Sequence, residues 1–189
     1  MSKVPAYVPA HGLLKDKSVL VTAAAGGGIG AATARSCLEE GARVMVIADI
    51  HERRLKEAVA ALQKDFADRA IHGRIANVTV EADVSSLVEH AEKWSGGVDV
   101  LVNNAGLGGS KRLVEMSDEE WLRGIDVSLN GTFRMMRTML EKVLPRGRGA
   151  IVNNASVHGR GAQEGHDRSA AGTAAAKRLT RAPSTADAV

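Results

Sequence analysis

The amino-acid sequence predicts an α/β protein with a doubly wound parallel sheet, and three observations support that fold class. A short run of β-branched and aliphatic residues, Ser18–Thr22, is followed by a glycine cluster and then by an Ala-rich segment with helical spacing. A second apolar run ends on a carboxylate, Asp49. Further along, strand-like and helix-like segments keep alternating, which is typical of a parallel sheet covered by helices on both faces.

These patterns place five strands and four helices in the chain. The expected strands lie within residues 13–22 and at 43–48, 71–78, 98–103 and 150–156. The expected helices span about residues 28–40, 51–67, 81–94 and 118–144. The last helix opens on the capping box Ser117-Asp-Glu-Glu120, in which the serine and the glutamate three residues later each bond the other's backbone. The helical spacing places one apolar stripe along this helix: Trp121, Ile125, Leu129, Phe133, Met136 and Leu140.

The glycine cluster at residues 26–30 stands between a predicted strand and a predicted helix, which is the position of a phosphate-binding turn. Its spacing, Gly26-x-Gly28-x-Gly30, differs from the usual G-x-G-x-x-G. One glycine would allow the tight turn, one the close approach of a pyrophosphate, and one the packing of helix on strand. The N–H groups at the start of the helix would hold the phosphate charge. We therefore expect a Rossmann-like dinucleotide site.

Asp49 lies 19 residues beyond Gly30, close to the position where an acidic side chain binds a ribose 2′-hydroxyl. A carboxylate accepts hydrogen bonds from the ribose diol but repels a 2′-phosphate. The position therefore favours NAD over NADP. The alternative is that Asp49 only caps the helix beginning at Ile50.

Length, charge and cysteine content bound the remaining possibilities. The 189 residues suit a dinucleotide-binding domain at 1–157 and an atypical segment at 158–189 that is not a separate domain. The net charge of +3 is small, so no nucleic-acid partner is expected. No apolar run reaches the roughly 18 residues of a membrane span, and residues 1–7 lack a signal-peptide core. The single cysteine, Cys37, is expected in the core of a cytoplasmic protein, and no metal site is expected.

Four sequence elements together carry a resemblance to a known family. They are the glycine turn after Val21-Thr22, then Asp49, then Asn103-Asn104-Ala105-Gly106, and finally Asn153-Asn154-Ala155-Ser156-Val157-x-Gly159. With them the chain resembles the short-chain dehydrogenases/reductases over about residues 12–157. The Asn-Asn-Ala-Gly element is the most specific, because its amides bridge backbone groups where a strand ends and its glycine leaves room for a dinucleotide.

The resemblance implies that this chain binds NAD, with NADP less favoured. The implied cofactor-binding residues are Thr22, Gly26, Gly28, Ile29, Gly30, Asp49, Asn77, Val78, Asn104, Ala105 and Gly106. The chain departs from the family at two places. Ala23 stands where the family has a glycine and the loop is one residue longer, and Asn77-Val78 replaces an Asp-Val pair that contacts the adenine. Asp83 is expected on the surface of a helix.

The resemblance also implies catalytic positions, and here the chain departs further. The family uses a Ser, a Tyr with a Lys four residues later, and an Asn on the long helix. Ser156 fits the first role and Ser128 takes the Asn position. Ser169 and Thr173 stand at the Tyr and Lys positions, so both are substituted. The protein has one tyrosine, Tyr7, and no other frame restores the phenol.

Three classes of function therefore compete. The first is an NAD(P)-dependent oxidoreductase that transfers hydride between the nicotinamide and a small-molecule substrate with a hydroxyl or carbonyl group. The second is a dinucleotide-binding pseudoenzyme, or a truncated product without turnover, which accounts for the absent Tyr and Lys. The third is a methyltransferase or a nucleotide-sugar epimerase, and the two Asn-containing elements argue against it. We favour the oxidoreductase.

The segment after residue 157 is expected to contribute little to the core. A helix over 169–181 is possible, but its apolar stripe is thin. His158 and His166 are expected as isolated, exposed side chains, and the alternative is that they replace the missing catalytic acid. The strand at 151–155 would be an unpaired edge. The long helix would offer an adaptable apolar surface for subunit contact through Met135, Met136 and Met139. A homo-oligomer is therefore expected.

Overall fold

The computed structural model describes residues 8–161 and 165–181, so Tyr7 and the ends of the chain lie outside the described residues. Its centre is a five-stranded parallel sheet with the order β3-β2-β1-β4-β5. The strands are β1 (Ser18–Thr22), β2 (Val44–Asp49), β3 (Ala70–Ile75), β4 (Val100–Asn103) and β5 (Ala150–Asn153). This confirms the predicted fold class, a doubly wound α/β sheet of the Rossmann type.

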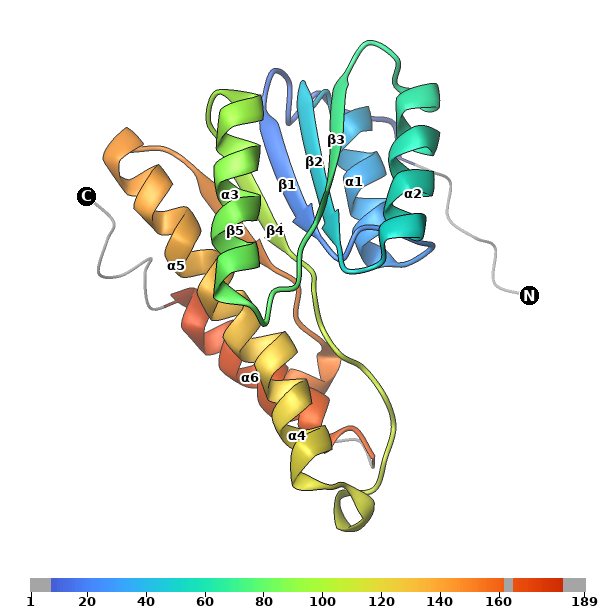
Figure 1. Ribbon diagram of the computed structural model, residues 1–189, viewed down its shortest axis with the longest axis vertical. Coiled ribbons are helices and arrows are strands. Elements are labelled where there is room, and N and C mark those ends of the chain that lie inside the picture. Colours follow the sequence, from blue (N-terminus) through green and yellow to red (C-terminus); the bar gives the residue numbers. More distant parts are fainter. Residues whose placement is uncertain (1–7, 162–164, 182–189) are drawn as a thin grey trace.

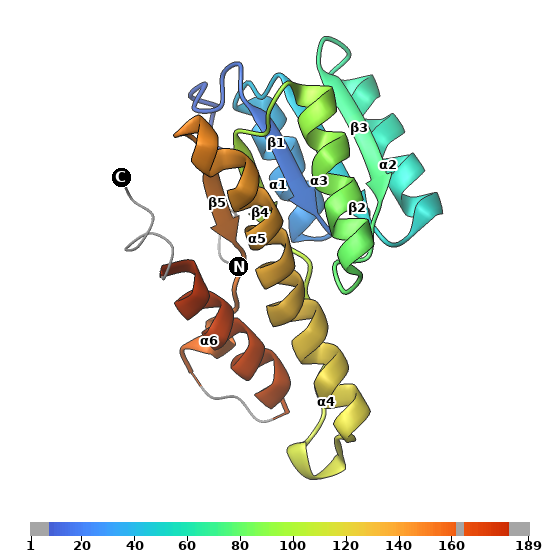
Figure 2. The same cartoon turned by 60° about the vertical axis from the view of Figure 1, so that its left-hand side comes forward.

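Helices cover both faces of this sheet. Figures 1 and 2 show α1 and α2 on one face and α3 and α5 on the other, while α4 and α6 extend below the strands. The helices are α1 (Ile29–Glu39), α2 (Glu52–Asp65), α3 (Glu81–Ser95), α4 (Asp118–Ile125), α5 (Gly131–Val143) and α6 (Asp167–Arg181). Short turns complete the chain: 3₁₀ turns η1 (Leu113–Glu115), η3 (Leu144–Arg146) and η4 (Val157–Gly159), and a π-helical segment η2 (Asp126–Asn130).

The sheet divides the apolar core into two layers, and the residues of β1 contribute to both. Leu20 belongs to the layer under α3 and α5, whereas Val19 and Val21 belong to the layer under α1 and α2. All five residues of β1 are buried, because side chains on alternate positions of a strand point to opposite faces and both faces are covered here. The buried core on both faces thus holds the strands in place, and the carboxyl ends of β1 and its neighbours lie together at one edge of the sheet.

The structure begins and ends several strands differently from the sequence pattern. β1 begins only at Ser18, because residues 13–16 form a turn in which Asp16 adopts a positive φ of 63°. β3 ends at Ile75, so Asn77 and Val78 lie in the loop beyond it. β5 ends at Asn153, and Ser156 is the N-cap of η4 instead of a strand residue.

The long helix forms where it was predicted, but its buried face is different. The capping box at Ser117 and Glu120 has both of its hydrogen bonds. The π-helical segment η2 then adds a residue to one turn, which rotates everything after it by about 100° relative to a continuous α-helix. The exposed fraction of Phe133 is 44%, and the core receives a set of methionines instead: Met135, Met136 and Met139. The expectation that these methionines form an exposed contact surface was therefore wrong.

The segment after β5 is more ordered than its composition suggests. α6 begins at Asp167 and packs against η4, α4 and η2, with Ala176 buried on its inner side. The rings of His158 and His166 are half-buried and their centroids lie 4.3 Å apart. The expectation that these two histidines are isolated and exposed was wrong, because η4 and the start of α6 fold back on each other.

Candidate nucleotide-binding cleft and active site

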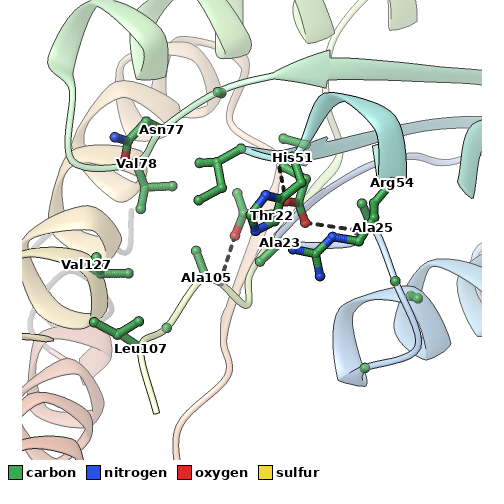
Figure 3. A pocket seen from close by; sticks show the side chains of 18 of the residues that line it. Thr22, Ala23, Ala25, His51, Arg54, Asn77, Val78, Ala105, Leu107 and Val127 are labelled. Atoms are coloured by element: carbon green, nitrogen blue, oxygen red, sulfur yellow. Dashed lines mark hydrogen bonds between the residues drawn. The ribbon is translucent and has the colours of Figure 1, made fainter. Parts of the chain in front are cut away.

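A cleft of about 440 Å³ opens at the carboxyl ends of β1, β2, β3 and β4, as Figure 3 shows from close by. This is the edge of a parallel sheet at which α/β proteins bind their ligands. Eight of the predicted cofactor-binding residues line the cleft: Thr22, Gly26, Gly28, Asp49, Asn77, Val78, Ala105 and Gly106. Three predicted residues, Ile29, Gly30 and Asn104, are not among the lining residues.

The glycine turn keeps the cleft wall free of side chains. Gly26 has a φ of +128°, and a Cβ on Gly27 or Gly28 would point into open space. Gly28 is the N-cap of α1 and contributes no side-chain acceptor to the first turn of the helix. Gly30 has a structural role instead, because a Cβ there would come within 2.3 Å of the Ala23 carbonyl oxygen. The helix N-terminus therefore lies open at the cleft, where an anion is favoured.

Ala23 occupies the position where the sequence lacks the expected glycine. Its φ is +52°, in the left-handed region that costs an L-residue about 1–2 kcal/mol. The longer loop thus retains a backbone conformation that suits glycine, although an alanine is present. The departure at this position changes the side chain but leaves the turn in place.

Asp49 connects the glycine turn to the start of α2. Its exposed fraction is 8%, and its two oxygens accept hydrogen bonds from the backbone N–H groups of Ala25 at 3.1 Å and His51 at 3.0 Å. The bond to His51, the N-cap of α2, gives Asp49 a structural role at that helix. Each carboxylate oxygen still has acceptor capacity, because it receives only one of these hydrogen bonds.

The Asn103–Asn104 element joins β4 to its neighbours on both sides. The hydroxyl of Thr22 accepts hydrogen bonds from the backbone N–H groups of Asn104 at 2.9 Å and Ala105 at 3.0 Å. The side-chain amide of Asn104 donates to the carbonyl oxygens of Thr22 at 3.2 Å and Ala23 at 3.1 Å. On the other side, Asn103 donates to Asn153 at 2.8 Å. These bonds fix the distance between the glycine turn and the loop that follows β4.

Asn77 shapes the loop after β3 through its own polar groups. Its side-chain oxygen accepts hydrogen bonds from the N–H group and the hydroxyl of Thr79, at 3.0 and 2.9 Å. Its backbone N–H donates to the carboxylate of Asp83 at 2.9 Å. Asp83 was expected as a surface residue of its helix, and that description was incomplete, because it holds this loop. Val78 is buried beside Gly131 of α5.

The predicted catalytic positions come from three segments. Ser156 accepts a hydrogen bond from the N–H of His158 at 3.2 Å. Ser128 accepts one from the N–H of Leu107 at 3.1 Å, so it holds the loop after β4. Thr173 donates to the carbonyl oxygen of Ser169 at 2.7 Å, one turn earlier on α6. No phenol is present at any of these positions.

Two further contacts tie α6 to the rest of the site. A Cβ on Gly172 would lie 3.4 Å from Cβ of Ser128, in ordinary contact, and Gly159 of η4 packs against Thr173. At the start of α6, Arg168 donates to the carbonyl oxygens of Glu120 at 2.8 Å and Gly108 at 3.0 Å. α6 therefore lies beside both Ser128 and the segment after Ser156.

An ion pair joins the loop after β4 to the start of α4. Lys111 bonds both carboxylate oxygens of Glu120, at 2.7 and 2.6 Å. Together with the backbone N–H of Ser117, this contact lowers the pKa of Glu120 to about 2. The capping box and the loop after β4 are thereby joined through one carboxylate.

Sequence reasoning missed several residues that the fold brings to the site. His51 and Arg54 from the start of α2, Arg123 of α4, Leu107 and Val127 all line the cleft. Lys177 lies four residues after Thr173 on α6, which is the spacing of a Tyr-x-x-x-Lys pair without its tyrosine. Arg54 lies in the first turn of α2, five residues after Asp49, and no local signal in the sequence distinguishes it from the other charged residues of that helix.

Two features are absent from the described parts of the chain. Within residues 8–161 and 165–181, no three His, Cys, Asp or Glu side chains gather in a way that could hold a metal ion. Across the same residues, none of the helices combines the length and the apolarity needed to cross a bilayer.

Comparison with known proteins identifies the class to which this fold and cleft belong. Residues 17–186 match the family described as short chain dehydrogenase. The chain therefore belongs to the short-chain dehydrogenase family, whose members are oxidoreductase enzymes. The resemblance inferred from the four sequence elements is confirmed.

Particular relatives are similar over most of the chain. A Mycobacterium tuberculosis protein, (5R,7aS)-5-hydroxy-7a-methyl-1-oxo-2,3,5,6,7,7a-hexahydro-1H-indene-carboxyl-CoA reductase, is 48% identical over 96% of this chain and 69% of its own length. The Streptomyces niveus short-chain reductase protein NovJ is 36% identical over 83% of this chain and 59% of its own length. The chain thus spans about 60 to 70% of these two curated relatives.

Solved structures show the same architecture. The crystal structure of a short chain dehydrogenase from Mycobacterium smegmatis superposes with a TM-score of 0.91 at 44% identity, covering 98% of this chain and 77% of that one. NAD⁺-bound xylitol dehydrogenase superposes with a TM-score of 0.87 at 26% identity, covering 93% of this chain and 66% of that one.

Proposed function

We propose that the chain is an NAD-dependent oxidoreductase that transfers hydride between the nicotinamide and a hydroxyl or carbonyl group of a small molecule. The observation that carries the proposal is the cleft in which the glycine turn, the open start of α1 and Asp49 meet. Its volume of about 440 Å³ is within the range of small-molecule and cofactor sites. A dinucleotide fits these residues, because the wall lacks side chains where phosphates must approach the backbone.

The residues at and around the cleft have different parts in this proposal. Gly26, Gly28 and Ile29 at the start of α1 bind the pyrophosphate through backbone N–H groups. Asp49 accepts hydrogen bonds from the adenosine ribose, which favours NAD over NADP. Asn77 and Val78 border the adenine, whereas Gly30 and Asn104 keep the turn in shape. NAD supplies the hydride acceptor or donor when it is bound.

The substrate side of the site has weaker acid–base chemistry than the fold usually carries. Ser156 holds the substrate oxygen in this proposal, and Ser128 positions the loop through Leu107. Ser169 and Thr173 have no phenol or ammonium group, and a positioned general acid contributes about 10²–10⁴-fold to a rate. We therefore expect slow turnover from this chain. The alternative, a protein that binds the dinucleotide without turnover, follows from the same two substitutions.

The substrate class is a further part of the proposal. The name of the Mycobacterium tuberculosis relative denotes a bicyclic compound that is linked to coenzyme A. Alicyclic ketones and alcohols, free and as coenzyme A thioesters, are therefore the first substrates to test. We also propose a cytoplasmic location, because Cys37 is a buried free thiol, and its burial raises its pKa and keeps it unreactive.

Turnover of such substrates, followed by NADH absorbance, tests the proposed function. The native chain is expected to be slow, and Ser169→Tyr with Thr173→Lys is expected to raise the rate by about 10²-fold or more. Ser169→Phe with Thr173→Lys is the matched control, since it adds the same bulk without a hydroxyl. Thr173→Tyr tests an alternative alignment of the catalytic pair, because the new tyrosine and Lys177 then have the spacing of Tyr-x-x-x-Lys.

The outcomes separate the alternatives. A fast native chain would show that the catalytic positions are misassigned. NADH binding without turnover in the native chain and in the restored variants would favour the binding protein over the oxidoreductase. If Thr173→Tyr raises the rate and Ser169→Tyr with Thr173→Lys does not, the position of the family's tyrosine is Thr173 and not Ser169.

A further inference from the structure

The ribose end of the cleft contains opposite charges that do not neutralise each other. Asp49, His51 and Arg54 all line this end, and Figure 3 shows the Arg54 side chain directed from the first turn of α2 towards the loop at Ala25. Arg54 forms no ion pair or hydrogen bond with any of the described residues, Asp49 included. A carboxylate and a guanidinium thus share one end of the cleft, each with hydrogen-bonding capacity that a ligand could use.

Arg54 differs in this respect from the charged residues beside it in the helix. Arg53 pairs with Glu57 at 2.8 Å, and Lys56 pairs with Glu52 at 2.7 Å, both as i,i+4 pairs on the outer surface of α2. These pairs are the ordinary use of charges on a solvated helix face. Arg54 lines the cleft instead, and since none of the described residues pairs with it, a ligand bound there could use its guanidinium.

Asp49 and Arg54 favour different ligands at the same place. A buried carboxylate accepts hydrogen bonds from a ribose diol and repels a phosphate. A guanidinium has no acceptor capacity, but it binds phosphate oxygens with two parallel hydrogen bonds. The first group therefore selects a nucleotide with a free 2′-hydroxyl, and the second selects one with a 2′-phosphate.

We propose that Arg54 is a latent 2′-phosphate site, masked by Asp49, and that the cofactor preference of this chain is the balance of these two residues. The proposal rests on the proposed function, since it requires the cleft to bind the adenosine half of a dinucleotide. It goes beyond that function in one respect. Neutralising Asp49 alone converts the site to NADP(H), and no new cationic residue has to be introduced.

The test is a calorimetric titration of the full chain with NADH and NADPH, and with adenosine 5′-monophosphate and adenosine 2′,5′-bisphosphate as probes that lack the nicotinamide. The variants are Arg54→Gln, Asp49→Asn and the double variant. Arg53→Gln is the matched control, because it removes the same side chain one position earlier and outside the cleft. Circular dichroism of Asp49→Asn establishes that the variant has kept the secondary structure of the native chain.

Asp49→Asn is expected to shift the ratio of NADPH to NADH affinity towards NADPH by about 10- to 100-fold, which is the worth of one hydrogen bond to a charged group. In the double variant, Arg54→Gln is expected to lower the ratio of NADPH to NADH affinity at least tenfold relative to Asp49→Asn alone. In the native background, where Asp49 is intact, Arg54→Gln is expected to lower the affinity for the 2′,5′-bisphosphate more than that for the 5′-monophosphate. Arg53→Gln should leave both ratios as they are.

Two failures are distinguishable. If the native chain binds neither NADH nor the 5′-monophosphate, the proposed function is wrong and this inference is wrong with it. If the native chain binds NADH but Arg54→Gln changes the ratios no more than Arg53→Gln does, the cleft binds its nucleotide and the role of Arg54 is wrong. The native-background variant gives this result even if Asp49→Asn does not fold.

Discussion

The side-chain amide of Asn154 donates a hydrogen bond of 2.8 Å to Oδ1 of Asn104, a residue 50 positions earlier in the chain. Asn104 in turn bonds the backbone at Thr22 and Ala23, at the start of the glycine turn. The carboxyl ends of three neighbouring strands, β1, β4 and β5, are therefore connected through one amide. The two Asn-containing sequence elements act together as a brace for the cleft.

Asn104→Ala should lower the free energy of unfolding by about 1–3 kcal/mol, because one side chain loses its bonds to Thr22, Ala23 and Asn154. Urea denaturation measures this change. Asn130→Ala is the control, since the side chain of Asn130 is exposed and donates to Asp126 alone. An equal loss in both variants would show that the brace adds nothing to stability.

Met139→Ala should destabilise the fold by about 2–5 kcal/mol, because Met139 is fully buried and its truncation leaves a cavity. Phe133→Ala should cost less, because the Phe133 ring is partly exposed and packs over Arg137 on the surface. The comparison tests the rotation of the helix faces by the π-helical segment. A larger loss for Phe133→Ala than for Met139→Ala would contradict that rotation.

Stability should fall as the pH drops below about 6.5, because of a histidine pair between β3 and α3. Burial lowers the pKa of His72, and the nearby charge of His90 adds to this shift; burial, Arg74 and Lys93 lower the pKa of His90. The unfolded chain therefore takes up protons at a higher pH than the folded chain, and acid favours unfolding. Well above about 6.5 both histidines are neutral in the folded and the unfolded chain, and the stabilisation is complete.

Urea midpoints between pH 8 and pH 5 measure this effect. In His72→Gln/His90→Gln the decline between pH 7 and pH 5.5 should be smaller than in the native chain. His51→Gln removes an exposed histidine and serves as the control. An unchanged decline in the double variant would show that other groups cause the acid sensitivity.

The chain should associate through the outer edge of β5. β5 is the last strand of the sheet, and the exposed fraction of Val152 is 51%. Unpaired backbone groups next to apolar side chains favour pairing with another chain, and a lysine on such an edge opposes it. Val152→Lys should therefore shift sedimentation towards the monomer, whereas Val157→Lys, outside the sheet, should not. A single native species of 19.8 kDa at micromolar concentration would contradict the prediction.

Local patterns predicted the parts of this structure that local forces determine. The alternation of strands and helices, the capping box at Ser117 and the glycine turn depend on a few neighbouring residues, and all three are present. Met136 was expected on the apolar stripe of the long helix and is buried, whereas the burial of Met135 and Met139 was missed because a π-helical segment leaves no periodic signal in the sequence. The contact between His158 and His166 was missed because it depends on how α6 folds back over η4.

Some residues of the candidate site were likewise predictable from local sequence, whereas others depend on the fold. Asp49 was identifiable from its spacing to the glycine turn, because a parallel sheet brings successive strand ends to one edge. Arg54 and Arg123 were not, since a surface arginine on a helix has no pattern until the neighbouring strands fix what it faces. Asp83 was misjudged for the same reason: its partner, the backbone of Asn77, is visible only in the fold.

The central claim is that the cleft at the end of β1 binds NAD(H), with Asp49 setting the preference. Trp94 and Trp121 allow the most direct measurement, a titration of the native chain with NADH and with NADPH followed by tryptophan fluorescence and calorimetry. We predict saturable binding of one NADH per chain, with clearly weaker binding of NADPH. Equal or tighter binding of NADPH would contradict the role of Asp49, and no saturable binding of either nucleotide would contradict the claim itself.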